Sequence, residues 1–262
     1  MPRYKLTLEY DGTPFVGWQR QTNGLAVQQV LEEAVRGFVG EDVTVHGSGR
    51  TDAGVHALGQ VAHITLTKDH TTDTVRKAIN QHLIPHPVAV LAVEAVADDF
   101  HARFSAAQRS YRYLIVNRRA RLTLARARAW HVPVPLDAEV MHQAAQSLIG
   151  KHDFTTFRSV NCQAISPLKT LDTLSVERRG EEVWIYTSAQ SFMHNQVRAM
   201  VGSLKMVGEG KWPQSRLAEA LAACDRTACG PTAPAHGLYF DSVTFGPRRF
   251  GPNGEGSEGE AD

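Results

Sequence analysis

The segment HGSGRTDAGVHALGQ, residues 46–60, places an arginine and an aspartate two positions apart in a stretch rich in glycine. A carboxylate beside a guanidinium stays ionised, because the opposite charge favours the charged form. An ionised Asp52 can act as a nucleophile or as a base. Arg50 and Asp52 point the same way if the backbone between them is extended, and the glycines leave room for a bulky ligand. The alternative, on charge and spacing alone, is a surface ion pair in a tight turn.

Residues 103–128 form a second stretch that could bind a ligand, because arginine recurs in it. Arg109 and Arg112 flank Tyr111, and Arg118 and Arg119 follow in the same stretch. Guanidinium groups suit phosphate, and an aromatic ring among them can stack on a base. The formal net charge of the whole chain is only +1, so this local excess is a basic stripe. It predicts nucleic-acid binding; the alternative is a solvated loop beside a core tyrosine.

Arg198 lies beside the apolar face of a predicted helix, whose apolar positions are Val197, Met200, Val201 and Leu204. An arginine that is partly turned toward a core usually has an anionic partner. Asp52 is one candidate for that partner. A local acid or a backbone carbonyl is the alternative.

Several other chemistries lack their motifs in this sequence. There is no G-x-x-x-x-G-K-[ST] phosphate loop, and the glycines at 47 and 49 lack the third glycine of a dinucleotide fingerprint. The cysteines have no zinc-finger spacing, and no G-x-S-x-G segment occurs. These absences argue against a phosphate-loop nucleotide site, a dinucleotide site, a metal site and a serine-hydrolase site, and Asp52 remains the strongest candidate for catalysis.

Hydrophobic periodicity predicts the elements that must position these residues. In the first hundred residues the order is strand, helix, strand, strand, helix, strand, over 4–10, 27–38, 43–47, 57–66, 72–83 and 88–96. A similar order then recurs with one extra helix, over 110–117, 137–150, 169–178, 181–190, 194–210, 214–223 and 237–245. Two copies of the split β-α-β order predict an α+β fold with two ferredoxin-like halves that share a mostly antiparallel sheet.

The predicted halves are residues 1–105, which carry the glycine-rich loop, and residues 106–245. The tail, residues 246–262, is rich in glycine and charge, so we expect it to be disordered. Three cysteines are too few for a disulfide framework and are typical of a reducing compartment. No stretch has the character of a signal peptide or a membrane span, so we expect a soluble, cytoplasmic protein without a membrane partner.

The motifs resemble those of the TruA family of tRNA pseudouridine synthases. The resemblance is carried by GRTDAGVHALGQV and, in the same order along the chain as in that family, by EYDGTPFVGWQRQ, DDFHARFSAAQRSYRY, LIGKHDFTTFR, FMHNQVRAMVG and GLYF. It covers nearly the whole chain apart from the tail. Several separated motifs in the right order make this resemblance far more specific than one glycine-rich loop would be.

The resemblance implies an isomerase that converts uridine to pseudouridine in the anticodon stem-loop of tRNA, at positions 38, 39 and 40, without cofactor or metal. It also implies a homodimer whose two α+β halves flank a basic cleft. By the same resemblance the catalytic aspartate is Asp52, Arg50 guides a flipped base, Tyr111 is the active-site tyrosine and Arg198 pairs with the aspartate. An apolar residue of the uracil pocket corresponds to Leu238.

Two other functions are alternatives to this one. An RNA-binding protein of the same fold would keep the arginines without needing Asp52. A glycoside hydrolase would usually need two carboxylates, and no second acid lies in the loop around Asp52. The arginine stripe would also have no purpose in an enzyme for small glycosides.

Overall fold

The computed structural model describes residues 1–159 and 166–246, and it divides into two compact units. Unit 1 contains Met1–Ala106 together with Tyr239–Gly246, and unit 2 contains Ala107–Leu238. Within the described residues, no helix has both the length and the apolar character needed to cross a bilayer. Cys162 and residues 247–262, which make up nearly all of the tail that we expect to be disordered, lie outside the described residues.

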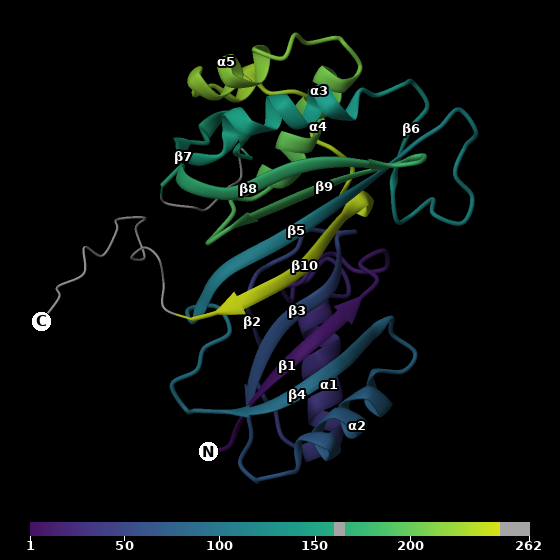
Figure 1. Ribbon diagram of the computed structural model, residues 1–262. Coiled ribbons are helices and arrows are strands. Elements are labelled where there is room, and N and C mark those ends of the chain that lie inside the picture. Colours follow the sequence, from purple (N-terminus) through teal and green to yellow (C-terminus); the bar gives the residue numbers. More distant parts are fainter. Residues whose placement is uncertain (160–165, 247–262) are drawn as a thin grey trace, which may run out of the picture. The chain divides into compact units, whose positions relative to one another are not determined.

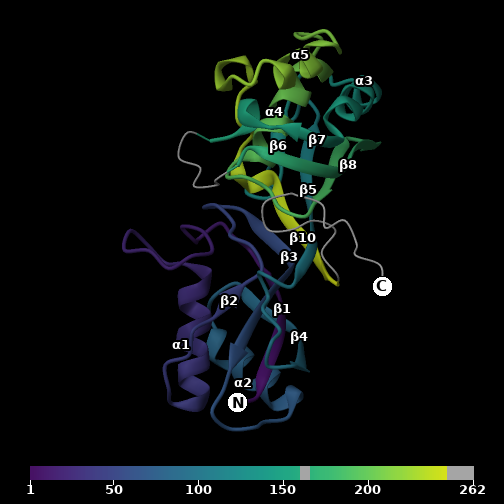
Figure 2. The same cartoon turned by 90° about the vertical axis from the view of Figure 1, so that its left-hand side faces the viewer.

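Unit 1 is a mostly antiparallel sheet with two helices on one face (Figures 1 and 2). Its elements are β1 (Arg3–Tyr10), α1 (Val27–Val39), β2 (His46–Gly47), β3 (His56–Thr65), α2 (Thr72–Leu83), β4 (Val88–Val96) and most of β10 (Leu238–Phe245). β1 lies between β3 and β4 and is antiparallel to both, while the short β2 pairs with β3. The predicted order of strands and helices is confirmed for this unit.

The apolar spacing of the sequence explains how α1 and β1 form. Every second residue of β1 is buried, from Tyr4 to Tyr10, as expected of a strand with one face on the core. The buried stripe of α1 contains Val27, Val30, Leu31, Ala34 and Val35. The helix ends at Gly40, whose φ of 76° is left-handed and whose N–H donates to the carbonyl of Arg36.

Unit 2 is a second sheet with helices on one face, and Figure 1 shows α3, α4 and α5 on the same side of it. Its elements are β5 (Ala106–Asn117), β6 (Trp130–Val132), α3 (Ala138–Ala145), β7 (Gly150–Asp153), β8 (Leu168–Arg179), β9 (Glu182–Ala189), α4 (Gln196–Gly208) and α5 (Arg216–Ala222). The strand order is β5-β9-β8-β7, all antiparallel, and β6 adds to β5 in parallel. Gly180, with φ of 62°, closes the predicted hairpin between β8 and β9.

The structure differs from the predicted elements of the second half in two places. The helix predicted over 137–150 ends at Ala145, and a short 3-10 turn leads into β7. The chain leaves the helical conformation at Ile149, which is extended (φ −74°, ψ 139°), and Gly150 follows with φ of 109°. The three-residue strand β6 was not predicted, because its pattern is too short to show alternation.

The division into units also differs from the predicted boundaries in one respect. The break at Ala106 is one residue from the predicted one, but Tyr239–Gly246 belongs to unit 1, not to the second half. Tyr239 and Phe240 pair in parallel with the start of β3, and Phe245 packs on Phe100 at a ring distance of 5.0 Å. These contacts are non-local, so local sequence patterns do not reveal them.

A histidine cluster in unit 1 predicts that the stability of the protein depends on pH. His63 on β3 is 3% exposed, and its Nδ1 accepts the N–H of Ala102 at 3.2 Å. Burial lowers the pKa of His63 from 6.5 to about 4, and the nearby His46, His101 and Arg3 add to this effect. His63 therefore stays neutral in the folded protein at neutral pH.

Because the pKa of His63 is lower in the folded than in the unfolded state, its contribution to stability is complete above pH 6.5 and is lost as the pH falls toward 4. We expect the free energy of unfolding to drop by about 3 kcal/mol over this window through His63. His63→Asn keeps an acceptor for Ala102 but cannot titrate. Urea unfolding at pH 7.5, 5.5 and 4.5 should show a smaller drop in this variant; parallel curves for both proteins would contradict the assignment.

Candidate active site

The loop between β2 and β3 carries Asp52, and buried hydrogen bonds fix its first half. The N–H of Ser48 donates to the carbonyl of Val61 at 2.7 Å, and its hydroxyl donates to Gln60 Oε1 at 2.6 Å. Gln60 Nε2 in turn donates to the carbonyl of Gly49 at 2.9 Å. Ser48 and Gln60 have no exposed surface, so these bonds do not compete with water.

Thr51, between Arg50 and Asp52, is the inward anchor of the loop. Its hydroxyl lies 2.8 Å from the hydroxyl of Tyr10 on β1, and its carbonyl accepts the N–H of Trp18 at 3.0 Å. Thr51 is 7% exposed, whereas Arg50 is exposed and Asp52 is half-buried. Successive residues thus alternate between inward and outward positions, which turns the two charged side chains away from the core of unit 1.

Tyr10 stays neutral beneath the loop. Burial raises its pKa to about 12, and hydrogen bonds with Thr51 and Gln60 offset part of this effect. A neutral phenol can donate one hydrogen bond and accept another. Tyr10 therefore links the two polar side chains that hold the loop, without adding a charge beneath Asp52.

Glycines allow the second half of the loop to pack closely against neighbouring backbone. Gly17 forms an isolated antiparallel bridge with Asp52, and a Cβ at Gly17 would lie 2.7 Å from the carbonyl oxygen of Thr51. A turn follows in which Val55 N–H donates to Asp52 O at 3.1 Å, with Gly54 at φ of 76°. These contacts set the backbone position of Asp52 from both sides.

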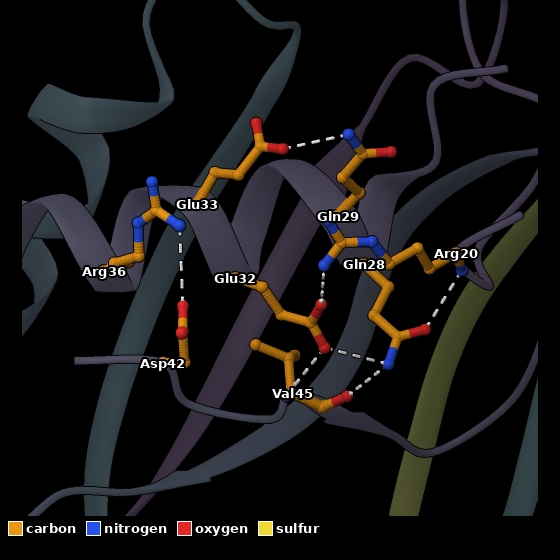
Figure 3. A network of polar contacts seen from close by, with 8 residues as sticks. All are labelled: Arg20, Gln28, Gln29, Glu32, Glu33, Arg36, Asp42 and Val45. Carbon is orange, nitrogen blue, oxygen red and sulfur yellow. Dashed lines mark hydrogen bonds and ion pairs between the residues drawn. The ribbon is translucent and has the colours of Figure 1, made fainter. Parts of the chain in front are cut away.

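A polar network on α1 contacts the segment that enters β2, just before this loop (Figure 3). Glu32 Oε1 accepts the N–H of Val45 at 3.3 Å, and its other carboxylate oxygen lies 3.2 Å from the Arg20 guanidinium. Gln28 Nε2 donates to Glu32 Oε1 and to the carbonyl of Val45, both at 3.1 Å. One helical turn thus binds the segment entering β2 and the segment that follows Trp18.

In unit 2, Tyr111 and Arg109 share one face of β5. Tyr111 is 8% exposed, and its ring meets that of Phe192 edge-on, at 5.1 Å and 86°. The Arg109 guanidinium donates to the carbonyl of Gln190, just after β9. These contacts orient both side chains from the end of the β5–β9 ladder.

The remaining arginines of the predicted stripe are not on this face. Arg112 is on the other face of β5, because side chains alternate along a strand, and its guanidinium lies 5.5 Å from the ring of Trp184. Arg118 forms an ion pair with Glu181 at 3.0 Å, and Arg119 is exposed. The structure therefore separates residues that the sequence places in one stripe.

Arg198 is held at the start of α4 by neutral acceptors. Its Nε donates to the carbonyl of Ala233 at 2.7 Å, and its Nη1 donates to Asn195 Oδ1 at 2.8 Å. Its own carbonyl accepts the N–H of Ala233 at 3.0 Å. The carbonyl alternative raised by the sequence is thus present, while pairing of Arg198 with Asp52 stays a prediction.

The segment that binds Arg198 also supports Leu238. Tyr113 donates its hydroxyl proton to the carbonyl of Pro234 at 2.8 Å, and burial raises the pKa of Tyr113. A Cβ at Gly237 would lie 2.5 Å from the Tyr113 ring. Leu238 follows at once and is 5% exposed. Unit 2 therefore places Leu238 in the segment that contacts both Arg198 and Tyr113.

Sequence reasoning identified the charged and aromatic residues but missed the polar supports of the loop. Ser48, Thr51 and Gln60 all lie within the segment 46–60 that carries Asp52, yet their types are ordinary in exposed loops. Only their burial shows that they position the carboxylate. Among the described residues, no cluster of three or more histidine, cysteine, aspartate or glutamate side chains could hold a metal ion.

Comparison with known proteins identifies the class to which this fold and these motifs belong. The sequence profile of a family described as tRNA pseudouridine synthase matches residues 7–105 and 144–246. This match covers well over half of the chain, including Asp52 and Arg198 in their motifs. The chain belongs to the tRNA pseudouridine synthase family.

Individual relatives agree with this family over nearly the full length. A protein of Azorhizobium caulinodans named tRNA pseudouridine synthase A is 64% identical, with 94% of this chain and 95% of the relative covered. Proteins with the same name from Parvibaculum lavamentivorans and Paramagnetospirillum magneticum are 60% and 59% identical, over 94% and 97% of this chain and all of their own. A chain from a Cbf5-Nop10-Gar1 complex aligns with a TM-score of 0.39 at 9% identity, over 91% of this chain and 49% of its own.

The close approach of Gly17 to the loop predicts that Gly17→Ala disturbs Asp52. Gly17 has φ of 120°, and its added Cβ would press on the Thr51 carbonyl. We expect a loss of about 1–3 kcal/mol in the free energy of unfolding and a clear loss of turnover. Gly40→Ala is the matched control, because Gly40 also has a left-handed φ but has nothing within 4 Å of its Cβ position. Equal turnover of the two variants would show that the Gly17 contact does not position the loop.

Proposed function

We propose that this member of the tRNA pseudouridine synthase family modifies uridines of the anticodon stem-loop, at positions 38, 39 and 40, with Asp52 as the catalytic carboxylate. The observation that carries the proposal is the placement of Asp52. It is the acid in the family motif, on a loop fixed by buried hydrogen bonds, and it turns outward beside Arg50. A carboxylate held in this way is organised before the substrate binds, which reduces the reorganisation needed during reaction.

The reaction is an isomerisation. The N1–C1′ glycosidic bond of uridine breaks, the uracil turns, and a C5–C1′ bond forms; the C5 hydrogen leaves as a proton and N1 gains one. Atoms and electrons balance without an oxidant, a reductant or an external energy source. Asp52 either attacks C1′ to form a covalent intermediate or removes a proton from C2′ to give a glycal. Both routes need the same ionised carboxylate next to the ribose.

The other residues bind and orient the nucleotide. A base in a stem must be flipped out, at a cost of about a few kcal/mol. Arg50, exposed beside Asp52, fills the vacated space and contacts phosphate. Tyr111 stacks on the uracil and Leu238 lines its pocket, while Arg198 keeps Asp52 charged when water is excluded. These roles come from the family motifs and from the residue chemistry.

The arginines of the stripe have different parts in this proposal. Arg109 shares the face of Tyr111 and contacts the substrate near the uracil. Arg118 and Arg119 follow β5 and bind phosphates farther along the tRNA, and Arg112 does so from the opposite face of β5. We also infer that the protein works as a homodimer and without a metal or cofactor, as the resemblance implies, and that it works in the cytoplasm, as its few cysteines suggest.

Asp52→Asn tests the central role directly, because it removes one charge and little volume. Making the C5–C1′ bond expels the C5 hydrogen, so tritium release from tRNA labelled at uracil C5 measures the reaction itself. We expect release by the wild type, none by Asp52→Asn, and near-normal tRNA binding by both. Near-normal turnover by the variant would refute the role of Asp52. Tight tRNA binding without release by the wild type would favour the non-catalytic RNA-binding function.

Tyr111 is assigned a stacking role that depends on its ring. Tyr111→Phe keeps the ring and its edge-on contact with Phe192, so we expect turnover within a few-fold of wild type. Tyr111→Ala removes the stacking surface and should cost on the order of 10- to 100-fold, equivalent to roughly 1–3 kcal/mol. The measurement is the single-turnover rate on the same labelled tRNA. Equal losses in both variants would instead assign the hydroxyl to the chemistry.

A further inference from the structure

An exposed aromatic ring in unit 1 lies on a rigid base that none of the roles above uses. Phe104 follows β4 and is 56% exposed, which is high for phenylalanine. His101 Nδ1 accepts the N–H groups of Arg103 and Phe104, at 3.2 and 3.4 Å. The hydroxyl of Ser105 accepts the N–H of His101 at 3.0 Å. The turn that presents the ring is thus held by its own side chains.

Three histidine rings in contact with one another connect the Phe104 ring to the core of unit 1. The His101 ring lies 4.4 Å from that of Phe104 and 4.7 Å from that of His63, which is buried on β3. His46 on β2 stacks on His63 at 4.8 Å and 16°. These contacts lead from the buried His63 through His101 to the exposed Phe104. The Phe104 ring is therefore held in place by its neighbours. We call Phe104, Arg103, His101 and His46 the aromatic platform.

The charges around the aromatic platform suit a nucleotide. The guanidinium of Arg103 lies 5.8 Å from the centre of the Phe104 ring, and both residues are exposed. A ring beside a guanidinium offers stacking for a base and a donor for a phosphate. Two exposed acids, Asp98 and Asp99, precede the turn and limit the local positive charge. Stacking is therefore expected to contribute more than charge.

We propose that the aromatic platform binds an unpaired base of the tRNA substrate, with Phe104 stacked on that base and Arg103 on its phosphate. The base is not the reacting one. The loop with Asp52 joins β3 at His56. The aromatic platform contacts His63, which lies seven residues farther along the same strand. At 3.3 Å per residue this is about 23 Å, several nucleotides away. The inference rests on the proposed function for the identity of the RNA.

The experiment compares Phe104→Ala with Phe104→Trp and with Leu91→Ala, which removes an exposed apolar side chain from β4 of the same unit. Binding of an unmodified tRNA transcript is measured, together with kcat and KM for tritium release. We expect Phe104→Ala to bind about 5- to 100-fold more weakly, with a similar rise in KM and kcat within twofold of wild type. Phe104→Trp and Leu91→Ala should bind as the wild type does.

The salt dependence of tRNA binding distinguishes the stacking contribution of Phe104 from the phosphate contact of Arg103. Phe104→Ala should leave the slope of log Kd against log salt unchanged, because stacking releases no counterion. Arg103→Gln should reduce the magnitude of this slope by about one, because one phosphate contact is lost. Urea unfolding of each variant verifies that it folds as the wild type does.

The outcomes distinguish failure of this inference from failure of the proposed function. Wild-type binding and KM in Phe104→Ala, with turnover intact, would overturn the platform and leave the function standing. No turnover by wild type, together with weakened tRNA binding by Phe104→Ala, would overturn the function and support the platform. A change in oligomeric state by sedimentation, without a change in tRNA binding, would assign Phe104 to a contact between copies and overturn the proposal. No tRNA binding by wild type would overturn both.

Discussion

The hydrogen bond between Tyr10 and Thr51 is the contact on which the organisation of the candidate site depends. Thr51 stands between the two charged residues of the loop, and its 2.8 Å contact with a buried phenol fixes which way the chain faces. With Thr51 turned inward, its neighbours Arg50 and Asp52 face outward by simple alternation. A loop without this anchor would be free to rotate the carboxylate toward or away from solvent at little cost. The position of one neutral side chain therefore determines where the charge is presented.

The surrounding contacts restrict the same loop in different ways. Gln60 and Ser48 satisfy backbone groups of the glycine segment, so that it can lie against β3 without unpaired donors or acceptors. Gly17 has no side chain, so its backbone can lie close to the Thr51 carbonyl, with which a Cβ would collide. Glu32 on α1 holds the flanking chain through Val45 and Arg20. The loop is thus fixed from the strand, from the neighbouring turn and from the helix, which is what a reaction needing an accurately placed carboxylate requires.

In unit 2, the candidate site residues on β5 are positioned by the alternation of side chains along the strand. Tyr111 and Arg109 face one side of β5, while Arg112 faces the other and stacks on Trp184. Arg198 donates to the carbonyl of Ala233 and to the amide oxygen of Asn195, and these hydrogen bonds hold it at the start of α4. The segment 233–238 supports Arg198, Tyr113 and Leu238 together.

The sequence by itself determined the order of elements in unit 1, the identity of Asp52 as the candidate carboxylate, and the family. Periodicity showed β1, α1 and the hairpin of β8 and β9, because local patterns decide which face of an element is buried. Sequence patterns could not show that Tyr239–Gly246 packs on unit 1, that the Arg112 guanidinium lies over the ring of Trp184, or that Thr51 and Gln60 are buried beneath the loop. Tertiary structure alone decided these, because each depends on contacts between residues far apart in the chain. The same polar side chain is a solvated loop residue or a buried support according to what packs against it.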